Sequence, residues 1–220
     1  MAQTHFLPSV TEEAARPPYR YLKSIDENHL RILTLKRCSD FHGEIECSLS
    51  TSVRDGFFPY EALSYCWGSA EQPRSRIILD GQTLVVREGL ASALRHLRSA
   101  DTERFLWVDA ICIDQSHEDE KGLQVRKMGE TYEKASKVVV WLGPPSEENK
   151  SALAVKAIAY LGLKYCTQTL NQVRSEKLSL PARIEGLGPD VYIPAIRKLL
   201  QREWFKRLWV CSGPSCNALL

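Results

Sequence analysis

Two short stretches of the sequence contain the residues best suited to binding or chemistry. Three of these residues come from each stretch: Ser64, Trp67, Gly68, Asp109, Asp114 and Gln115. A carboxylate at Asp109 or Asp114 could orient a ribose hydroxyl. Ser64 and Gln115 could supply hydrogen bonds, and Trp67 offers an aromatic face on which a base could stack. Because Asp and Ser also cap helices and close turns, the sequence leaves a structural role open beside ligand contact.

A single carboxylate, Glu61, stands inside an otherwise apolar segment and is a second candidate for chemistry. A carboxylate in such surroundings needs a partner or solvent, and burial perturbs its proton affinity. Glu61 could therefore act as a general base, or it could form an ion pair with an arginine such as Arg207 or Arg126. The planar fork of Arg207 could also pair with Asp109 or with a phosphate, although a surface arginine is the ordinary expectation.

Other reactive residue types carry weaker signals. Cys112 and His117 have the chemistry of a nucleophile and a base, but Ile111 and Ile113 flank the cysteine, which favours a buried, inert thiol. One acidic and histidine-containing group spans Asp109, Asp114, His117 and Glu118, and its spacing matches neither a calcium loop nor a zinc motif. We therefore predict no metal site.

The elements expected to position these residues alternate between strands and helices. Strands are predicted at 60–66, 105–108 and 137–142, and helices at 90–97, 119–135, 146–163 and 191–201. Two hairpins are predicted, one from 30–35 and 44–49 and one from 76–79 and 82–86 around Asp80-Gly81. The apolar run Lys137–Leu142 is typical of a strand covered on both faces. The pattern predicts an α/β fold with a parallel central sheet and added β-hairpins. Ligands bind such a sheet beyond the carboxyl ends of its strands, where the two stretches would share one crevice.

Composition limits the class of protein. The chain has 220 residues, of which 44% are hydrophobic, and this is enough for one large domain preceded by an extended tail at 1–20. Its formal net charge of +2 gives no reason to expect nucleic-acid binding. Seven cysteines without a C-x-x-C pair predict a reducing, intracellular and cytoplasmic setting. We also expect no signal peptide and no membrane span.

The two stretches resemble the signature blocks of the heterokaryon incompatibility (HET) domain. Tyr60–Gly68 reads YEALSYCWG against the family's Y-x-A-L-S-Y-x-W-G, and Leu106–Gln115 reads LWVDAICIDQ against L-W-[IV]-D-x-x-C-I-[ND]-Q. Further matches begin at Gln124-Val125 and end at Trp141-Leu142-Gly143. A last block, WFKRLWV from Trp204, is followed by Ser212 and Gly213 where the family has Gln-Glu. The resemblance implies a HET domain over 21–210 and a divergent or truncated end over 211–220.

This resemblance implies a fungal module of nonself recognition that signals programmed cell death by self-association or by binding a protein partner. HET domains are distantly similar to TIR domains, which have a flavodoxin-like arrangement of parallel strands, and some of which cleave NAD. The alternative is therefore a TIR-like NAD glycohydrolase with Glu61 and Asp109 as catalytic residues and NAD as substrate; no cofactor is firmly implied. The chain has no Gly-rich phosphate loop and no G-x-S-x-G elbow. Because the glutamate of TIR-type hydrolysis cannot be aligned, the signalling function is favoured.

Overall fold

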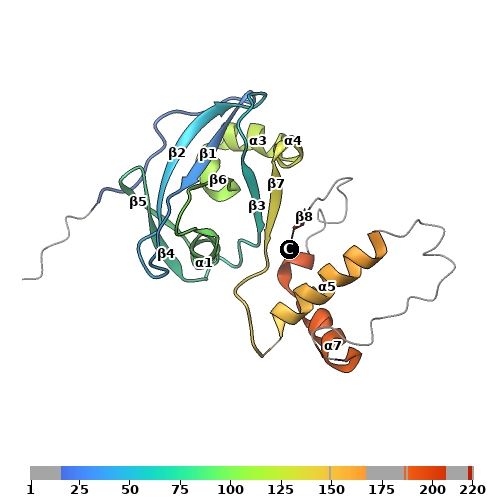
Figure 1. Cartoon of the computed structure of the whole chain (residues 1–220). Coiled ribbons are helices and arrows are strands. Elements are labelled where there is room, and N and C mark those ends of the chain that lie inside the picture. Colours follow the sequence, from blue (N-terminus) through green and yellow to red (C-terminus); the bar gives the residue numbers. More distant parts are fainter. Residues whose placement is uncertain (1–15, 149, 167–185, 187, 207–217, 220) are drawn as a thin grey trace, which may run out of the picture.

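The computed structural model describes residues 16–148, 150–166, 186, 188–206 and 218–219. Within these residues eight strands form one sheet, in the order β5-β4-β2-β1-β6-β3-β7-β8. The strands are β1 (His29–Leu35), β2 (Glu46–Val53), β3 (Glu61–Tyr65), β4 (Arg74–Leu79), β5 (Gln82–Arg87), β6 (Arg104–Trp107), β7 (Lys137–Trp141) and β8 (Ala218–Leu219). The predicted α/β class is confirmed (Figure 1).

Both predicted hairpins are present. Strands β1 and β2 pair antiparallel, and so do β4 and β5. At the second turn Asp80 and Gly81 have φ values of 50° and 74°, the left-handed conformations that a two-residue hairpin turn requires. The first hairpin does not lie at an edge of the described sheet. Strand β1 also pairs antiparallel with β6, so the hairpin lies inside the sheet and makes it mixed rather than parallel.

Strands β6, β3 and β7 are parallel neighbours, β8 continues this parallel part beyond β7, and a short parallel pairing also joins β2 to β4. Helix α1 (Glu88–Leu97) lies on the route from β3 to β6, and α2 (Asp109–Cys112), α3 (Glu118–Arg126) and α4 (Met128–Lys134) lie on the route from β6 to β7. Neighbouring side chains at the start of β3 point to opposite helices. Tyr60 donates to the carbonyl of Thr131 in α4, whereas Glu61 pairs with Arg104, which donates to the last residue of α1, Leu97. Helices α1 and α4 therefore cover opposite faces (Figure 1).

The helix predicted over 119–135 is divided in two. Lys127, with φ −91° and ψ 2°, ends α3 and precedes α4. The buried Arg54 guanidinium accounts for the break, because it donates to Gln124 in α3 at 2.7 Å and also to Thr131 in α4. A straight helix would separate these two acceptors by about 10 Å, at roughly 1.5 Å per residue.

The apolar core lies between the sheet and the helices that cover it. Its most buried members include Leu33, Leu63, Leu94, Leu106 and Trp107. The prediction that β7 is covered on both faces was wrong, because all of its side chains are only half-buried. Among the described strands, β8 alone lies beyond β7 in the sheet order.

A pair of helices follows β7. Helix α5 (Ser151–Cys166) begins later than predicted, after a turn in which the Ser151 hydroxyl accepts from the amide of Ser146 at 2.7 Å. It packs against α7 (Pro189–Leu200), and the short 3₁₀ helix η1 (Glu203–Lys206) follows. Arg202 donates to the carbonyl of Leu142 at 2.6 Å, which joins this part of the chain to the end of β7.

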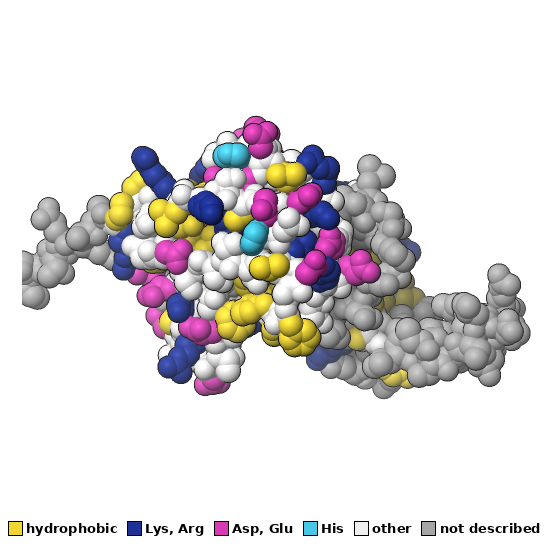
Figure 2. All heavy atoms as spheres, turned by 90° about the horizontal axis from the view of Figure 1, so that it is seen from above, with side chains coloured by type: hydrophobic (Ala, Val, Ile, Leu, Met, Phe, Trp, Pro, Cys, Tyr) yellow, Lys and Arg dark blue, Asp and Glu magenta, His cyan; other side chains and the backbone are white. Residues whose placement is uncertain are grey.

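At the start of the described chain, residues 16–19 lie along β5. The Tyr19 amide donates to the Thr83 carbonyl, and the Thr83 amide donates to the Pro17 carbonyl, both at 2.8 Å. The rest of the predicted tail, residues 1–15, lies outside the described residues. None of the described helices is long and apolar enough to cross a membrane. On the face shown in Figure 2, basic and acidic side chains are interspersed.

Candidate functional site

The two signature stretches meet at the carboxyl ends of β3 and β6, as their parallel pairing predicts. The indole Nε1 of Trp67 lies 3.1 Å from both carboxylate oxygens of Asp109. One of these oxygens also accepts from the backbone amide of Ala110 at 2.8 Å. The indole and the carboxylate, which were predicted to face a ligand, therefore hold each other. We call the group of Ser64, Trp67, Gly68, Asp109, Asp114 and Gln115 the C-terminal cluster.

The remaining members of the C-terminal cluster also have partners within the chain. Gln115 donates from Nε2 to the Asp109 carbonyl at 2.8 Å. The Asp114 carboxylate accepts from the amide of Ser116 at 3.0 Å and from its hydroxyl at 2.6 Å, which closes a turn. The buried Ser64 hydroxyl accepts from Trp204 Nε1 at 3.0 Å. These contacts match the structural roles that the sequence left open.

The backbone after β3 is fixed by Arg87. Its guanidinium donates to the carbonyls of Trp67 at 3.0 Å and Gly68 at 2.7 Å. The same group lies 5.7 Å from the centre of the Trp67 ring, so a cation covers an aromatic face on which a base was expected to stack. Gly68 has a φ of 72°, a conformation that favours glycine.

A buried ion pair supports the C-terminal cluster from behind. Arg31 in β1 and Glu120 in α3 have side chains that are 5% and 0% exposed. Glu120 accepts from the amide of Asp114 at 2.8 Å, and Arg31 donates to the carbonyl of Cys112 at 3.1 Å. Burial disfavours the charged carboxylate, but the bonds from Arg31 and from the amides of Asp114 and Ile25 together hold the pKa of Glu120 below its ordinary value.

Local sequence patterns do not reveal this pair. Glu120 is a charged residue in the first turn of α3, where an exposed position is the ordinary expectation, yet it is buried. The available signal was Arg31, a charged residue in the middle of an apolar strand, which needs a buried counter-charge. Nothing local identifies its partner, which lies 89 positions away along the chain.

Cys112 lies in the apolar core, as predicted. Its thiol is buried, and this burial raises the pKa to about 12. The sulfur accepts from the amide of Val108 at 3.3 Å rather than contacting His117. His117 instead accepts from the amide of Glu120 through Nδ1 at 3.2 Å, which caps the start of α3.

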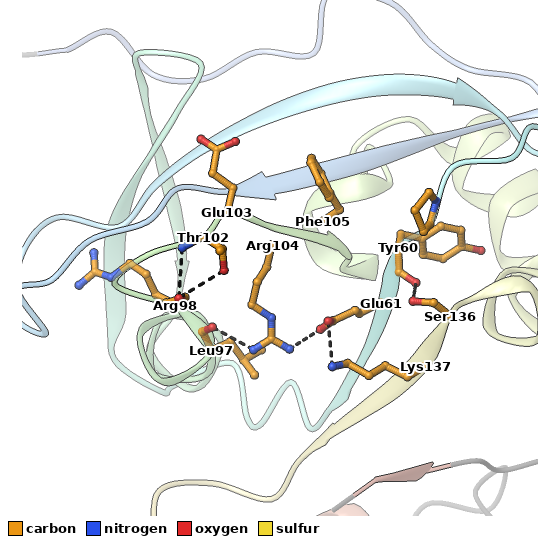
Figure 3. A pocket seen from close by; sticks show the side chains of 12 residues that line it. Tyr60, Glu61, Leu97, Arg98, Thr102, Glu103, Arg104, Phe105, Ser136 and Lys137 are labelled. Atoms are coloured by element: carbon orange, nitrogen blue, oxygen red, sulfur yellow. Dashed lines mark hydrogen bonds and ion pairs between the residues drawn. The ribbon is translucent and has the colours of Figure 1, made fainter.

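The opposite end of the parallel strands holds an open hollow of about 600 Å³, which we call the N-terminal hollow. It lies where β3, β6 and β7 begin, and Figure 3 shows the side chains around it. Its lining consists of Pro59, Tyr60, Glu61, Leu97, Arg98, Ser99, Thr102, Glu103, Arg104, Phe105, Ser136 and Lys137. Of the candidate site residues named from the sequence, Glu61 lines this hollow.

Glu61 forms ion pairs here, but with partners other than the predicted Arg126. Its carboxylate bonds to Arg104, and its other oxygen lies 3.0 Å from Lys137 Nζ. The register explains both partners, because Glu61 is directly opposite Lys137 in β7 and opposite Leu106, two residues beyond Arg104, in β6. Arg207, the other predicted partner, lies outside the described residues.

The described residues contain no group of three or more His, Cys, Asp or Glu side chains that could hold a metal ion. Histidines are used otherwise, as in the cap at His117 and in the contact between His96 and Trp141, whose ring centres are 4.9 Å apart.

The region that contains both ends is similar in sequence to known proteins. Residues 60–212 match the sequence profile of a family described as heterokaryon incompatibility protein (HET). The chain is also 28% identical over 211 residues to heterokaryon incompatibility protein 6, OR allele, of Neurospora crassa. That alignment covers 82% of this chain and 31% of the relative, so the chain spans less than a third of the relative's length. No solved structure matches the chain.

Proposed function

This chain belongs to the heterokaryon incompatibility (HET) family, and from that premise we propose that it is a module of nonself recognition that triggers programmed cell death. It does so through self-association or through binding a protein partner. The name of the Neurospora crassa relative, a heterokaryon incompatibility protein, supports this assignment.

One observation favours a binding role over catalysis. The side chains of the C-terminal cluster that could do chemistry are held by bonds within the chain, as in the contact of Trp67 with Asp109. Glu61, the other candidate catalytic residue, is paired with two cations. A general base has to reach the proton that it abstracts, and both carboxylate oxygens of Glu61 are already bonded to cations.

The second candidate function is TIR-like cleavage of NAD, and the topology supports it. The chain moves from β3 to β6 and then crosses back to β7 on the other side of β3, with helices α1 and α4 on opposite faces. This winding resembles that of doubly wound, flavodoxin-like sheets, in which ligands bind where the winding reverses. Trp67 and Asp109 lie at that point, beyond the ends of β3 and β6.

Controlled expression in a filamentous fungus tests the proposed signalling function. We expect induction of the chain to arrest growth and to admit a vital dye, and we expect the purified chain to form oligomers or to capture a partner from the same cells. The variant Glu118→Gln, which changes one exposed side chain on α3, is the matched control and should behave as the parent. Normal growth of cells that contain the folded chain would contradict the proposal.

Incubation of the purified chain with NAD separates the two functions. The signalling function predicts no release of nicotinamide from a folded and concentrated sample. Release that is abolished by Glu61→Gln or by Asp109→Asn would instead establish the enzyme. Asparagine at position 109 can still accept a bond from Trp67, so loss of release in that variant would report chemistry rather than unfolding.

A further inference from the structure

The N-terminal hollow has no part in the proposed signalling function. At its floor, positively charged side chains outnumber negatively charged ones. Its volume of about 600 Å³ is within the range of small-molecule sites. Among the described side chains that meet at its floor, two cations, Arg104 and Lys137, face one carboxylate, Glu61. Figure 3 shows these three groups pointing toward one another from three neighbouring strands. The floor therefore carries a net positive charge.

We propose that the N-terminal hollow binds a phosphate monoester, with Lys137 and Arg104 as the groups that hold the phosphate. The floor attracts an anion because its two positive charges exceed its single negative charge. The other charged groups of the lining are engaged elsewhere. Glu103 pairs with Lys36 at 3.1 Å, and Arg98 donates to backbone carbonyls such as that of Asp40 at 2.6 Å.

The cations of the floor differ in how firmly they are held. Arg104 is 22% exposed and also donates to the carbonyl of Leu97 at 2.9 Å, so its fork is fixed before any ligand arrives. Lys137 is 41% exposed and has three N–H donors, of which one lies toward Glu61. An incoming phosphate can therefore bond to Lys137 while Glu61 stays on Arg104. Partial burial strengthens this attraction relative to that of a fully solvated lysine.

An apolar rim favours a phosphate ester over free phosphate. The exposed ring of Phe105 lines the hollow and meets Phe58 edge to face, with ring centres 5.1 Å apart. Phe105 and Arg104 are neighbours in β6, so these rings lie on the opposite face of that strand from the floor, and an ester would reach both by passing the start of the strand. Hydroxyls of Ser99 and Thr102 also line the hollow and can accept or donate further bonds.

Titration with inorganic phosphate and with phenyl phosphate tests this proposal. Binding is followed by amide chemical shifts at low ionic strength, with benzyl alcohol as an uncharged comparison. We expect saturable shifts at Lys137 and its neighbours, with phenyl phosphate binding more tightly than inorganic phosphate and benzyl alcohol producing no such shifts. Equal affinities for the two anions would overturn the preference for an ester, and the absence of saturable shifts would overturn the site itself.

Substitutions that remove a single charge should change the affinity for phenyl phosphate in a predictable direction. Lys137→Gln should weaken phenyl phosphate binding roughly three- to thirtyfold, because one positive charge beside the phosphate is lost. Glu61→Gln should tighten it, because a negative charge is lost while the side-chain shape is kept. Lys121→Gln is the matched control, since Lys121 is 39% exposed and also pairs with one carboxylate, that of Glu118.

Two further outcomes would overturn the assignment of the residues. One is a loss of affinity in Lys121→Gln equal to that in Lys137→Gln, because binding would then follow net charge alone. The other is weaker binding in Glu61→Gln. Neither result depends on cell death or on NAD cleavage, so failure of the phosphate site and failure of the proposed function are distinguishable.

Discussion

The two ends of the same three parallel strands differ in how their polar groups are used. At the carboxyl ends, the C-terminal cluster is closed by bonds such as those of Trp67 with Asp109 and of Ser64 with Trp204. At the amino ends, the N-terminal hollow is open, and its charged groups meet at a partly solvated floor. Polar residues therefore gather beyond the carboxyl ends of the strands, as topology predicts. Whether these residues can contact a ligand depends on the bonds that they make within the chain.

The two ends also differ in what supports them. Behind the C-terminal cluster, the ion pair of Arg31 and Glu120 is almost fully buried and bonds to the loop that carries Asp114. The ion pairs of Glu61 lie at the surface of the hollow, where Glu61 is 19% exposed. Substitutions at the carboxyl ends should therefore mainly change folding stability, whereas those at the amino ends should mainly change binding.

The largest effect is expected from Glu120→Ala. It leaves the Arg31 guanidinium buried without its counter-charge and removes the acceptor for the amides of Asp114 and Ile25. We expect the free energy of unfolding to fall by about 3–5 kcal/mol, as for other broken buried pairs. Denaturant unfolding followed by tryptophan fluorescence measures this. Glu118→Ala, two residues earlier and 81% exposed, should stay within about 0.5 kcal/mol of the parent.

Acid should reproduce part of this loss without a mutation. The pKa of Glu120 in the folded chain is below the ordinary glutamate value of 4.5, so its contribution to stability is fully present well above pH 4.5. That contribution is lost as the pH falls through the lower, folded-state pKa. Stability measured from pH 7 downward should therefore decline less steeply in Glu120→Gln than in the parent. Identical pH profiles would show that Glu120 does not contribute.

A smaller effect is expected from Trp67→Phe at the C-terminal cluster. Phenylalanine keeps an aromatic ring beside Arg87 but removes the N–H that bonds to the Asp109 carboxylate. We expect a loss of about 1–2 kcal/mol in unfolding free energy, since hydrogen bonds to charged groups are worth more than neutral ones. Phenyl phosphate affinity should not change in this variant. A change in that affinity would mean that the two ends are coupled.

The smallest effect on stability is expected from Glu61→Gln at the N-terminal hollow. Glutamine keeps the shape and can still accept from Arg104, and the lost ion pairs are partly solvated. The free energy of unfolding should change by less than about 1 kcal/mol, as measured by denaturant unfolding beside the parent. A loss as large as that in Glu120→Ala would remove the distinction between the two ends.

Local sequence patterns predicted those elements of the fold whose conformation depends on neighbouring residues alone. The turn at Asp80-Gly81 follows from two residues that accept positive φ, and β3 and β6 follow from short apolar runs. The break at Lys127 and the inner position of β1 did not follow, because both depend on partners distant in the sequence. Arg54 lies 70 and 77 positions from its acceptors in α3 and α4.

For the candidate site, the sequence predicted which residues lie close together but not which of them bond to one another. Parallel pairing implied that Trp67 and Asp109 lie close together, and they do. It did not imply that they bond to each other, because hydrogen-bond partners depend on side-chain direction and distance rather than on strand order. The ion pairing of Glu61 was anticipated, but its partners required the register of β3 with β6 and β7.

Residues 17–19 cover the edge of the sheet at β5. Residues 17 and 19 use their backbone groups on Thr83, and the residue between them, Pro18, has no N–H to offer a further strand. The outermost backbone of this edge thus gives an incoming chain little to pair with. A shortened chain that begins after Tyr19 would uncover the edge of β5 and become prone to aggregate by strand addition.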